Sequence, residues 1–472
     1  MEQLERAAIP PTSCCQSMKT ELIMELDRTD SIMNCARKKK LRTRQFNFAS
    51  PIASAGLTAA IFTVCGNFVP SLALAEGFRN PPPGTQNLGR AGARAAHIDD
   101  ASSIAHNPAN LLDVPTAEVQ FAPTLVFIEA EYTSVAGVKA ETKEPWKILP
   151  NLFASIPIQD GRLAFGLGIT TPYGVGNEWK PTGAFGPGGN LRYTSAFSAE
   201  LKTINFNPSF AFRLHDRLQV GLGVDVFWSQ LTLKQFYPWL LVSGNPTDPD
   251  GVAKAQGDGF GAGGNLGITW EFADRQRLAF TVKTPVSVNY SGDFTLNNVP
   301  AGLGGGTLKS DFYSGIDFPT IVGLGYGIQL TDTIRVGADL EWIEFSRFDD
   351  LPLDVETPAP GLPSSVREDW NDTFTIGVGG DWKFSPNWIA RASYQFYESP
   401  VPDRTFSPVI PDAHQNVFTV GLGYAYKRHH LEAAYGLDFY NERNIRNNQQ
   451  PAFNGDYSLN VHLFSFTYRL NF

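Results

Sequence analysis

The residues best suited to chemistry gather between positions 97 and 106. His97 and His106 flank Asp99 and Asp100, and these residue types could hold a metal ion or move a proton. No further ligand follows at a suitable spacing, and the chain has no G-x-S-x-G elbow, H-E-x-x-H motif or phosphate-binding loop. We therefore expect Asp99 and Asp100 to cap a helix and form hydrogen bonds, and we expect no catalytic residue, cofactor or bound metal.

Two further features bear on the class of function. His429 and His430 lie at an expected short turn, where solvated side chains are favoured over a metal site. A phospholipase would need a serine and a histidine placed together, and no such pair stands out. The 47 acidic residues outnumber the 38 basic ones, which argues against nucleic-acid binding. We therefore look for a binding or transport function and not for an enzyme.

Residues 1–75 have a composition of their own. All four cysteines lie there, the last being Cys65. A basic run at 36–44, an apolar stretch at 52–64 and a small-residue site ending at Ala75 follow in the order of a secretory signal peptide. A single membrane anchor is the alternative, but glycine, asparagine and proline interrupt the stretch. Cleavage after Ala75 would leave an exported chain without cysteine, and Met33 would be a more ordinary start for the leader.

The exported part alternates apolar and polar residues at period two, with no long helical pattern after about position 113. In the last segment Phe466 and Tyr468 face one side while Thr467 and Arg469 face the other. We expect fourteen strands, at about 117–133, 148–158, 162–172, 193–214, 217–235, 257–272, 276–294, 312–330, 333–349, 367–384, 387–398, 414–427, 430–441 and 457–472.

The connections between these strands alternate in length. Short turns such as 215–216 and 273–275 alternate with long stretches rich in glycine, proline and asparagine, such as 236–256 and 351–366. This alternation is typical of an outer-membrane barrel, whereas a soluble sandwich would mix its loop lengths. Closure is required because unpaired strand edges are not tolerated in lipid. The terminal aromatic residue, Phe472, resembles the signal read by the barrel-assembly machinery.

The segment before the first strand carries the most specific motifs. Residues 76–114 include Gly77-Phe78, Leu88-Gly89-Arg90-Ala91, Asp99-Asp100-Ala101 and Asn107-Pro108-Ala109, and later stretches include Thr171-Pro172-Tyr173-Gly174 and Trp370-Asn371-Asp372. In this order, over essentially the whole exported chain, they resemble the FadL family of outer-membrane transporters for long-chain fatty acids and aromatic hydrocarbons. The resemblance implies an all-β fold, a transmembrane antiparallel barrel of fourteen strands at 115–472 with a small α-helical hatch at 76–114.

The same resemblance implies a function in the bacterial outer membrane. A hydrophobic molecule would be caught at the outer loops, pass the hatch and leave through the barrel wall into the membrane lipid, by diffusion and as a monomer. The hatch signature would be Gly89, Asp99, Asp100, Asn107, Pro108 and Ala109. The chain departs from the family at prolines 81–83, which stiffen a segment that moves in relatives.

Ligand-contacting residues are less well defined by the sequence. Phe236, Tyr237, Trp239 and Leu240 could form a lipid-facing aromatic girdle, an apolar capture groove or a packed loop. Arg192, Arg391 and Arg469 could bind a carboxylate in the lumen, although such arginines more often pair with hatch acids. Paired glycines, among them Gly221 and Gly223, indicate strand curvature or a cleared ligand path.

Two other functions fit a barrel of this kind. One is a general porin for polar solutes, which would need an open lumen. The other is a surface binding or adhesion protein, in which the long outer loops act and the barrel only anchors them. No motif separates fatty acids from aromatic hydrocarbons as the substrate, because the two differ in polar head and width.

Overall fold

The computed structural model describes residues 76–159 and 161–472. The predicted signal peptide, residues 1–75, lies outside the described residues. Within the described ranges, none of the helices has the length and apolar character needed to cross a bilayer. Strands make up most of this part of the chain.

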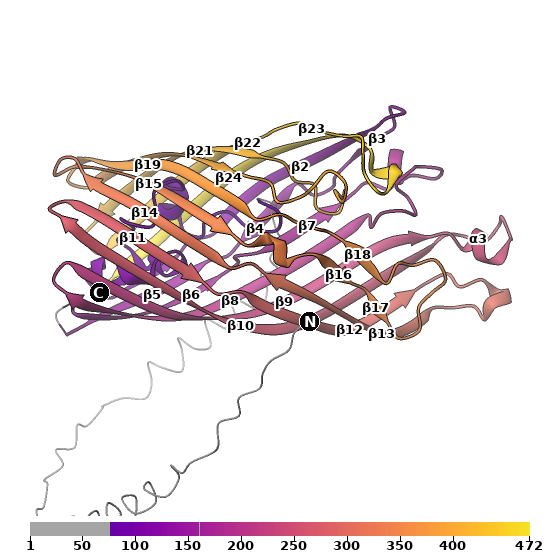
Figure 1. The fold of residues 1–472 in the computed structure, drawn as a ribbon, viewed down its shortest axis with the longest axis horizontal. Coiled ribbons are helices and arrows are strands. Elements are labelled where there is room, and N and C mark those ends of the chain that lie inside the picture. The colour runs from indigo at the N-terminus through magenta and orange to yellow at the C-terminus, as the bar shows by residue number, and fades with distance from the viewer. Residues whose placement is uncertain (1–75, 160) are drawn as a thin grey trace, which may run out of the picture. The chain divides into compact units, whose positions relative to one another are not determined.

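The wall of the molecule is one antiparallel sheet of long strands that follow one another in chain order (Figure 1). Several of the strands are interrupted and carry two labels. In order they are β1 (Glu118–Phe121) with β2 (Thr124–Ser134), β4 (Trp146–Leu149) with β5 (Leu152–Ile158), β6 (Leu163–Thr170) with β7 (Gly174–Glu178), β8 (Ser198–His215), β9 (Leu218–Tyr237), β10 (Gly251–Ala273), β11 (Gln276–Lys283) with β12 (Val286–Leu296), β13 (Leu308–Phe318) with β14 (Ile321–Gln329), β15 (Ile334–Ile343), β19 (Thr373–Ser385), β20 (Trp388–Tyr397), β21 (Gln415–Tyr426), β22 (His429–Tyr440) and β24 (Gly455–Asn471).

The sheet closes on itself because β24 pairs with both β1 and β2. The described residues therefore form a closed barrel of fourteen strands, as the sequence predicted. The two classes of connection are also confirmed: only Asp216 and Arg217 separate β8 from β9, whereas residues 344–372 separate β15 from β19. The short turns lie at the end of the barrel that also holds the C-terminus (Figure 1).

Short elements fill the long connections. They are β3 (Lys139–Glu141), η3 (Gly183–Phe185), α3 (Trp239–Ser243), η4 (Ala301–Leu303), η5 (Phe345–Arg347), β16 (Asp350–Pro352), β17 (Asp354–Val355), β18 (Ser365–Arg367), β23 (Arg443–Ile445) and η6 (Pro451–Phe453). β16 and β18 pair with each other as a separate two-stranded sheet.

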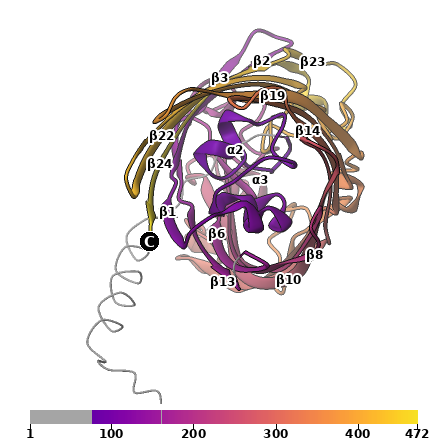
Figure 2. The same cartoon turned by 90° about the vertical axis from the view of Figure 1, so that its left-hand side faces the viewer.

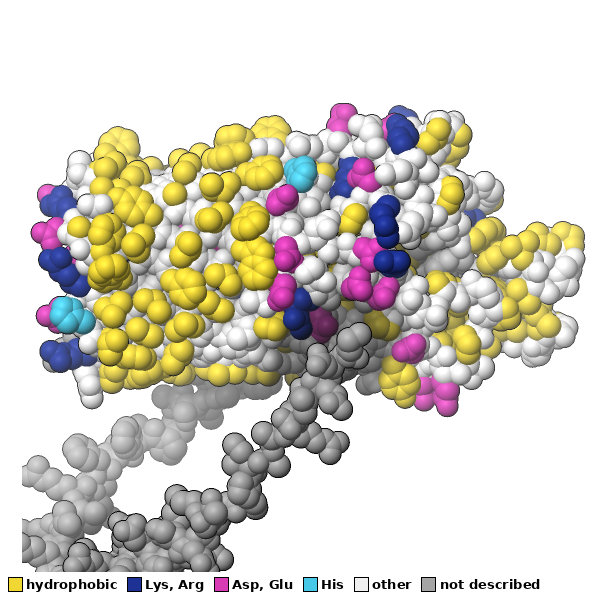
Figure 3. Space-filling model, viewed as in Figure 1, with side chains coloured by type: hydrophobic (Ala, Val, Ile, Leu, Met, Phe, Trp, Pro, Cys, Tyr) yellow, Lys and Arg dark blue, Asp and Glu magenta, His cyan; other side chains and the backbone are white. Residues whose placement is uncertain are grey.

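The outer surface of the barrel is a band of apolar side chains. On the face seen in Figure 3 the apolar side chains cover the half near the short turns, and charged groups gather at the turns and beyond the band toward the long loops. The last strand shows the alternation that builds the band. Phe466 and Tyr468 are exposed to the surroundings, while Ser465 and Thr467 are buried inside. The predicted orientation of this strand is therefore confirmed, and the band matches what a bilayer demands.

The inside of the barrel is filled by the N-terminal segment (Figure 2). This segment, residues 76–114, is the hatch. It contains one short α-helix, α2 (Thr85–Gly89), and two turns of 3₁₀-helix, η1 (Ala101–Ala105) and η2 (Pro108–Asp113). Nearly all of its side chains are buried against the strands around it. A barrel of this strand number leaves a lumen too wide for strand side chains alone, and here the hatch occupies it.

Candidate functional site

Asn107 organises the turn that starts η2. Its side-chain oxygen accepts a hydrogen bond from the Ala109 backbone N–H (3.1 Å), which caps the helix. Its side-chain nitrogen donates to the Ala95 carbonyl (2.7 Å) and to the Thr269 hydroxyl of β10 (2.9 Å). Pro108 occupies the first helical position, where a missing N–H costs nothing. Asn107, Pro108 and Ala109 therefore fix the conformation of this turn of the hatch and attach it to the barrel wall.

Two wall glycines provide the space for this turn. A Cβ atom on Gly221 would lie 2.3 Å from the backbone of Pro108 and Ala109, and one on Gly267 would lie 2.0 Å from the Asn107 side chain. Strand curvature and a ligand path were the two roles that the sequence suggested for glycines such as Gly221. The contacts show a third role, because the missing side chains let the hatch dock directly on the wall.

Ion pairs hold the rest of the hatch in place. Arg90 pairs with Asp381 of β19, and Arg335 of β15 bridges Asp381 (2.9 Å) and Asp99 (2.8 Å). On the same side of the hatch, Arg94 contacts Glu341 of β15 at 2.7 Å. Arg90 is fully buried, so the cost of desolvating its charge requires a partner of opposite sign.

The predicted hatch residues Gly89 and Asp100 complete this picture. Asp100 caps η1 by accepting a hydrogen bond from the Ser102 N–H (3.0 Å), and its carboxylate lies 3.7 Å from Arg469 of β24. Gly89 ends α2 and packs against Arg391 and Gly421. Arg391 of β20 pairs instead, across β21, with Glu432 of β22 at 3.0 Å. Its guanidinium is thus already neutralised inside the wall.

A large space with a mainly apolar lining lies among the long loops. We call it the outer chamber, a cavity of about 590 Å³. Side chains from β9, β10, β12 and β13 meet residues of the long connection between β15 and β19 around it. The apolar residues that line it are Leu233, Ala253, Ala255, Phe294, Phe312, Leu351, Leu353, Val355, Leu362, Val366, Val409 and Phe453.

A buried carboxyl group connects the outer chamber to the hatch. Glu368 lines the chamber and accepts a hydrogen bond from the Trp370 indole N–H (3.0 Å). Trp370 in turn stacks on Phe78 of the hatch, with ring centroids 5.0 Å apart. Burial raises the pKa of Glu368 to about 8, with a further contribution from Asp350. The folded protein therefore keeps the Glu368 carboxyl mostly protonated, and so mostly uncharged, at neutral pH.

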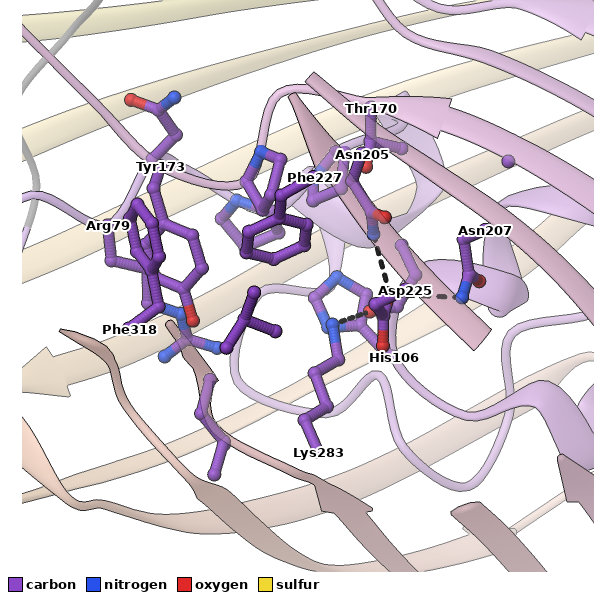
Figure 4. Close-up of a pocket in the computed structure, with 18 of the residues that line it drawn as sticks. Arg79, His106, Thr170, Tyr173, Asn205, Asn207, Asp225, Phe227, Lys283 and Phe318 are labelled. Carbon is purple, nitrogen blue, oxygen red and sulfur yellow. Dashed lines mark hydrogen bonds between the residues drawn. The ribbon is translucent and has the colours of Figure 1, made fainter. Parts of the chain in front are cut away.

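A second, smaller cavity of about 50 Å³ lies between the hatch and the wall (Figure 4). Aromatic side chains of Tyr173, Phe227 and Phe318 line one part of it, and Lys283 reaches it from the end of β11. In the described part of the chain the Lys283 ammonium donates to the Ala105 carbonyl (2.6 Å) and forms no close carboxylate pair. We call this space the inner cavity.

The wall next to the inner cavity is not continuously hydrogen-bonded. β5 pairs with β6, but no ladder joins β4 to β7 among the described residues, because the chain bends inward at residues 171–173. Hatch residues satisfy the backbone there. Gly174 N–H donates to the Phe78 carbonyl (2.7 Å), and Asn80 N–H donates to the Pro172 carbonyl (2.9 Å). We call the stretch between β4 and β7 the wall gap.

The features so far are a closed lipid-facing barrel, a docked Asn-Pro-Ala hatch and an apolar chamber among the outer loops. The sequence profile of a family described as outer membrane protein transport protein (OMPP1/FadL/TodX) matches residues 66–472. The chain belongs to this family. The protein is therefore an outer-membrane transport protein.

Individual relatives agree with the family assignment. The long-chain fatty acid transport protein of Escherichia coli K12 is 26% identical over 436 residues, which cover 84% of this chain and 94% of the relative. A FadL homologue from Pseudomonas aeruginosa has the same fold, with a TM-score of 0.71, 22% identity and coverage of 84% and 100%. The toluene transporter TodX of Pseudomonas putida follows with a TM-score of 0.63, 18% identity and coverage of 84% and 99%.

The aromatic loop residues of this FadL-family chain pack mainly with other loops. Phe236 stacks on Phe197 at 4.4 Å, and Trp239 donates to the Asn297 carbonyl (2.9 Å). Tyr237 donates to the Pro360 carbonyl (2.7 Å), while Leu240 is exposed. None of the four lines the outer chamber as described, although their neighbours Leu233 and Gln235 do.

Arg192 lies with these aromatic residues and not in the lumen. Its guanidinium pairs with Asp250 at 2.7 Å and lies 4.0 Å above the ring of Phe236. The residues that sequence reasoning missed are Lys283, Glu368 and the chamber lining. Only one signal in the sequence could have drawn attention to Lys283, namely a lysine followed by Thr-Pro inside a strand pattern, since proline interrupts the ladder there.

Replacing Gly221 by alanine tests the docking of the hatch. The added methyl group would collide with the backbone of Pro108 and Ala109, so we expect the hatch to shift and the unfolding free energy to fall by about 1–3 kcal/mol. We also expect a several-fold higher conductance in planar bilayers. Gly264→Ala is the matched control, because its nearest atom would be 3.6 Å away. Equal behaviour of the two variants would contradict the docking role.

Glu368→Gln tests the buried carboxyl. The pKa of Glu368 is about 8 in the folded protein and near 4.5 when exposed. As pH rises, the unfolded state therefore loses this proton at a lower pH than the folded state. The free energy of unfolding falls by up to about 1.4 kcal/mol per pH unit between pH 4.5 and 8. We expect the variant to lack this part of the decline in urea unfolding in detergent. A variant that keeps the full decline would show that Glu368 ionises normally.

Proposed function

We propose that the protein takes up hydrophobic molecules through its hatch-filled barrel by passive diffusion, with long-chain fatty acids as the first candidate and aromatic hydrocarbons as the second. The observation that carries the proposal is the apolar outer chamber of about 590 Å³, which lies among the loops while the lumen beyond it is filled. The names of the E. coli and P. putida relatives support both substrate classes.

The chamber gives such molecules a place to leave water. Each CH₂ group that moves from water into an apolar site contributes about 0.8 kcal/mol, so even a part of an acyl chain gains several kcal/mol in the chamber. The lining has the aliphatic and aromatic side chains that this transfer requires. A polar solute gains nothing comparable there.

The filled lumen argues against the two alternatives. A general porin needs a continuous aqueous path, but Arg90 and Arg94 of the hatch are at most 1% exposed, and the inner cavity holds only about 50 Å³. An adhesion protein needs only its loops and has no use for a docked hatch or a cationic inner cavity. Both features find a role in transport.

Lys283 gives the inner cavity a preference among hydrophobic molecules. Its ammonium reaches the cavity that Tyr173 and Phe318 also line, and it donates to a carbonyl rather than to a carboxylate. A fatty acid would bring its own carboxylate to this ammonium and place its chain along the aromatic rings. A hydrocarbon could use the rings alone. Arg391 is less suitable for this role because Glu432 already neutralises it.

The wall gap supplies a route into the membrane. Between β4 and β7 no ladder joins the described strands, and hatch residues Phe78 and Asn80 bond the backbone of Thr171, Pro172 and Gly174 there. A local shift of these hatch residues would open a lateral path from the inner cavity toward lipid without breaking any strand pair. An apolar molecule would then never cross water. We further propose that the protein acts as a monomer and that Phe472 serves as its assembly signal.

Paired substitutions test the substrate path. In a strain whose uptake depends on this protein, Leu353→Asp in the chamber should reduce entry of both oleate and toluene at least tenfold, since it places a charge in the apolar lining. Lys283→Met should reduce oleate entry by a similar factor and leave toluene entry within twofold. Leu241→Asp, on an exposed loop residue, is the control. Normal uptake of both compounds by Leu353→Asp would contradict the proposal.

Crosslinking tests the wall gap. The exported part has no cysteine, so cysteines placed at Lys147 of β4 and Val175 of β7 can be joined selectively by a short thiol crosslinker. We expect the link to lower uptake at least tenfold and reduction of a cleavable linker to restore it. A pair at Ala154 and Leu167, which already face each other in the ladder, is the control. Unchanged uptake after full crosslinking of the gap pair would exclude this exit.

A further inference from the structure

Two buried acidic side chains lie beside Glu76, which is the first described residue of the hatch and is itself acidic. Glu76, Asp412 and Asp438 are each at most 3% exposed. They come from the hatch, from the loop before β21 and from β22, so the fold brings them together from distant parts of the chain. A buried acidic group needs a positive partner or a set of hydrogen bonds to offset its loss of water.

Asp438 lacks such a partner. Its Oδ1 atom is buried and has no hydrogen-bond partner, and the charged group that acts on it most is another acid, Asp412. No Lys or Arg lies within 4 Å of its carboxylate in the part of the chain that the structure describes. The other oxygen, Oδ2, lies 3.0 Å from the Gln415 amide, whose nitrogen donates to it in one of the two orientations of that amide.

The nearby cations are engaged with other groups. Arg79 bridges Glu76 and Glu341, each at 3.0 Å, and this pairing occupies the Glu76 carboxylate together with the Thr375 hydroxyl at 2.7 Å. Arg443, on the other side, pairs with Asp403 at 2.8 Å. Its closest bond toward the cluster is to the Asp412 backbone carbonyl (2.9 Å), not to the carboxylate.

The atom that faces the cluster is the backbone nitrogen of Glu76. It lies 2.6 Å from the Gln415 amide oxygen, in the amide orientation that also binds Asp438. The next backbone N–H, that of Gly77, donates to Asp412. A cavity of about 10 Å³, close to the size of one water molecule, borders Glu76, Gln415 and Asp438. The start of the hatch is thus anchored by its own backbone nitrogens.

The backbone of Glu76 is also unusual. Its φ angle is +51°, in the left-handed region that a side chain other than glycine rarely adopts. The restriction comes from the carbonyl of the preceding residue pressing on Cβ. A chain that begins at Glu76 has no preceding carbonyl and therefore no such restriction.

We infer that Glu76 is the first residue of the mature protein and that its α-ammonium group is the cation of the buried site formed by Asp438, Gln415 and Asp412. A signal peptidase would hydrolyse the Ala75–Glu76 peptide bond. Water supplies OH to the Ala75 carbonyl, which leaves as a carboxylate, and its remaining proton goes to the Glu76 nitrogen, which takes up one more proton from solvent. The new ammonium carries three N–H donors in place of one.

In this proposal, cleavage of the signal peptide creates one of the groups that anchor the hatch. Before cleavage the Glu76 nitrogen offers one neutral donor to a cluster with surplus negative charge. After cleavage it offers a full positive charge to the otherwise unpaired Asp438. The inference does not depend on which molecule is transported, so its test can fail while the proposed function stands.

Chemical labelling of the α-amino group tests the site in the full protein purified from outer membranes. Intact-mass and N-terminal peptide analysis should find Glu76 first. Acetylation with a water-soluble succinimidyl ester at pH 7.5 should label this amine at least tenfold more slowly in folded wild type than in Asp438→Asn. The control Asp216→Asn, an exposed acid at a short turn, should label like wild type. A different first residue, or equal labelling rates in wild type and Asp438→Asn, would overturn the inference.

A second variant covers the case in which Asp438→Asn does not fold. Insertion of one alanine after Ala75 moves the cleaved amine one residue away from the site. We expect this variant to unfold at a lower temperature than wild type, and we expect Asp438→Asn to add no further loss in that background. Additive losses from the insertion and Asp438→Asn, or an insertion variant as stable as wild type, would show that the ammonium does not bind there.

Discussion

The whole structure follows from the rule that main-chain groups in lipid must find their partners within the protein. A sheet meets this rule only by closing, and here β24 closes it against β1 and β2. Fourteen strands then enclose more space than their side chains can fill. The hatch fills that excess space, and its residues Phe78 and Asn80 also bond the backbone beside β7, where no ladder joins β4 to β7 among the described residues. The closed barrel and the hatch inside it are therefore linked consequences of one requirement.

The hatch stays in the lumen by two kinds of contact. Glycine positions in the wall accept its backbone at the Asn107 turn, and buried ion pairs such as Arg90–Asp381 connect it to strands elsewhere around the ring. Charges in such places cost free energy to desolvate, and in these ion pairs the opposite charge offsets that cost. Lys283 and Asp438 depart from this pattern, since neither has a close partner of opposite charge in the described residues. The first lies on the proposed substrate path and the second faces the hatch terminus.

Period-two alternation predicted the strands well because it is local: Phe466 and Thr467 carry their orientation in their own side chains. The capping role of Asp100 was also predictable, since a cap acts over three residues. The outer chamber could not be predicted, because Leu353 and Phe312 meet only through the fold of loops far apart in sequence. Arg192 shows the same limit. Its type suggested a carboxylate partner, but whether it lay in the lumen depended on a long loop whose path no local pattern determines.

The position of the hatch ahead of the first strand ties the plug to the seam of the barrel. The hatch leads directly into β1, and β1 closes the sheet against β24. The seam ends where the Phe472 N–H bonds the Ala117 carbonyl (2.8 Å), three residues after the hatch. Closure of the ring and attachment of the plug therefore share a single joint, where Phe472 meets the stem of the plug.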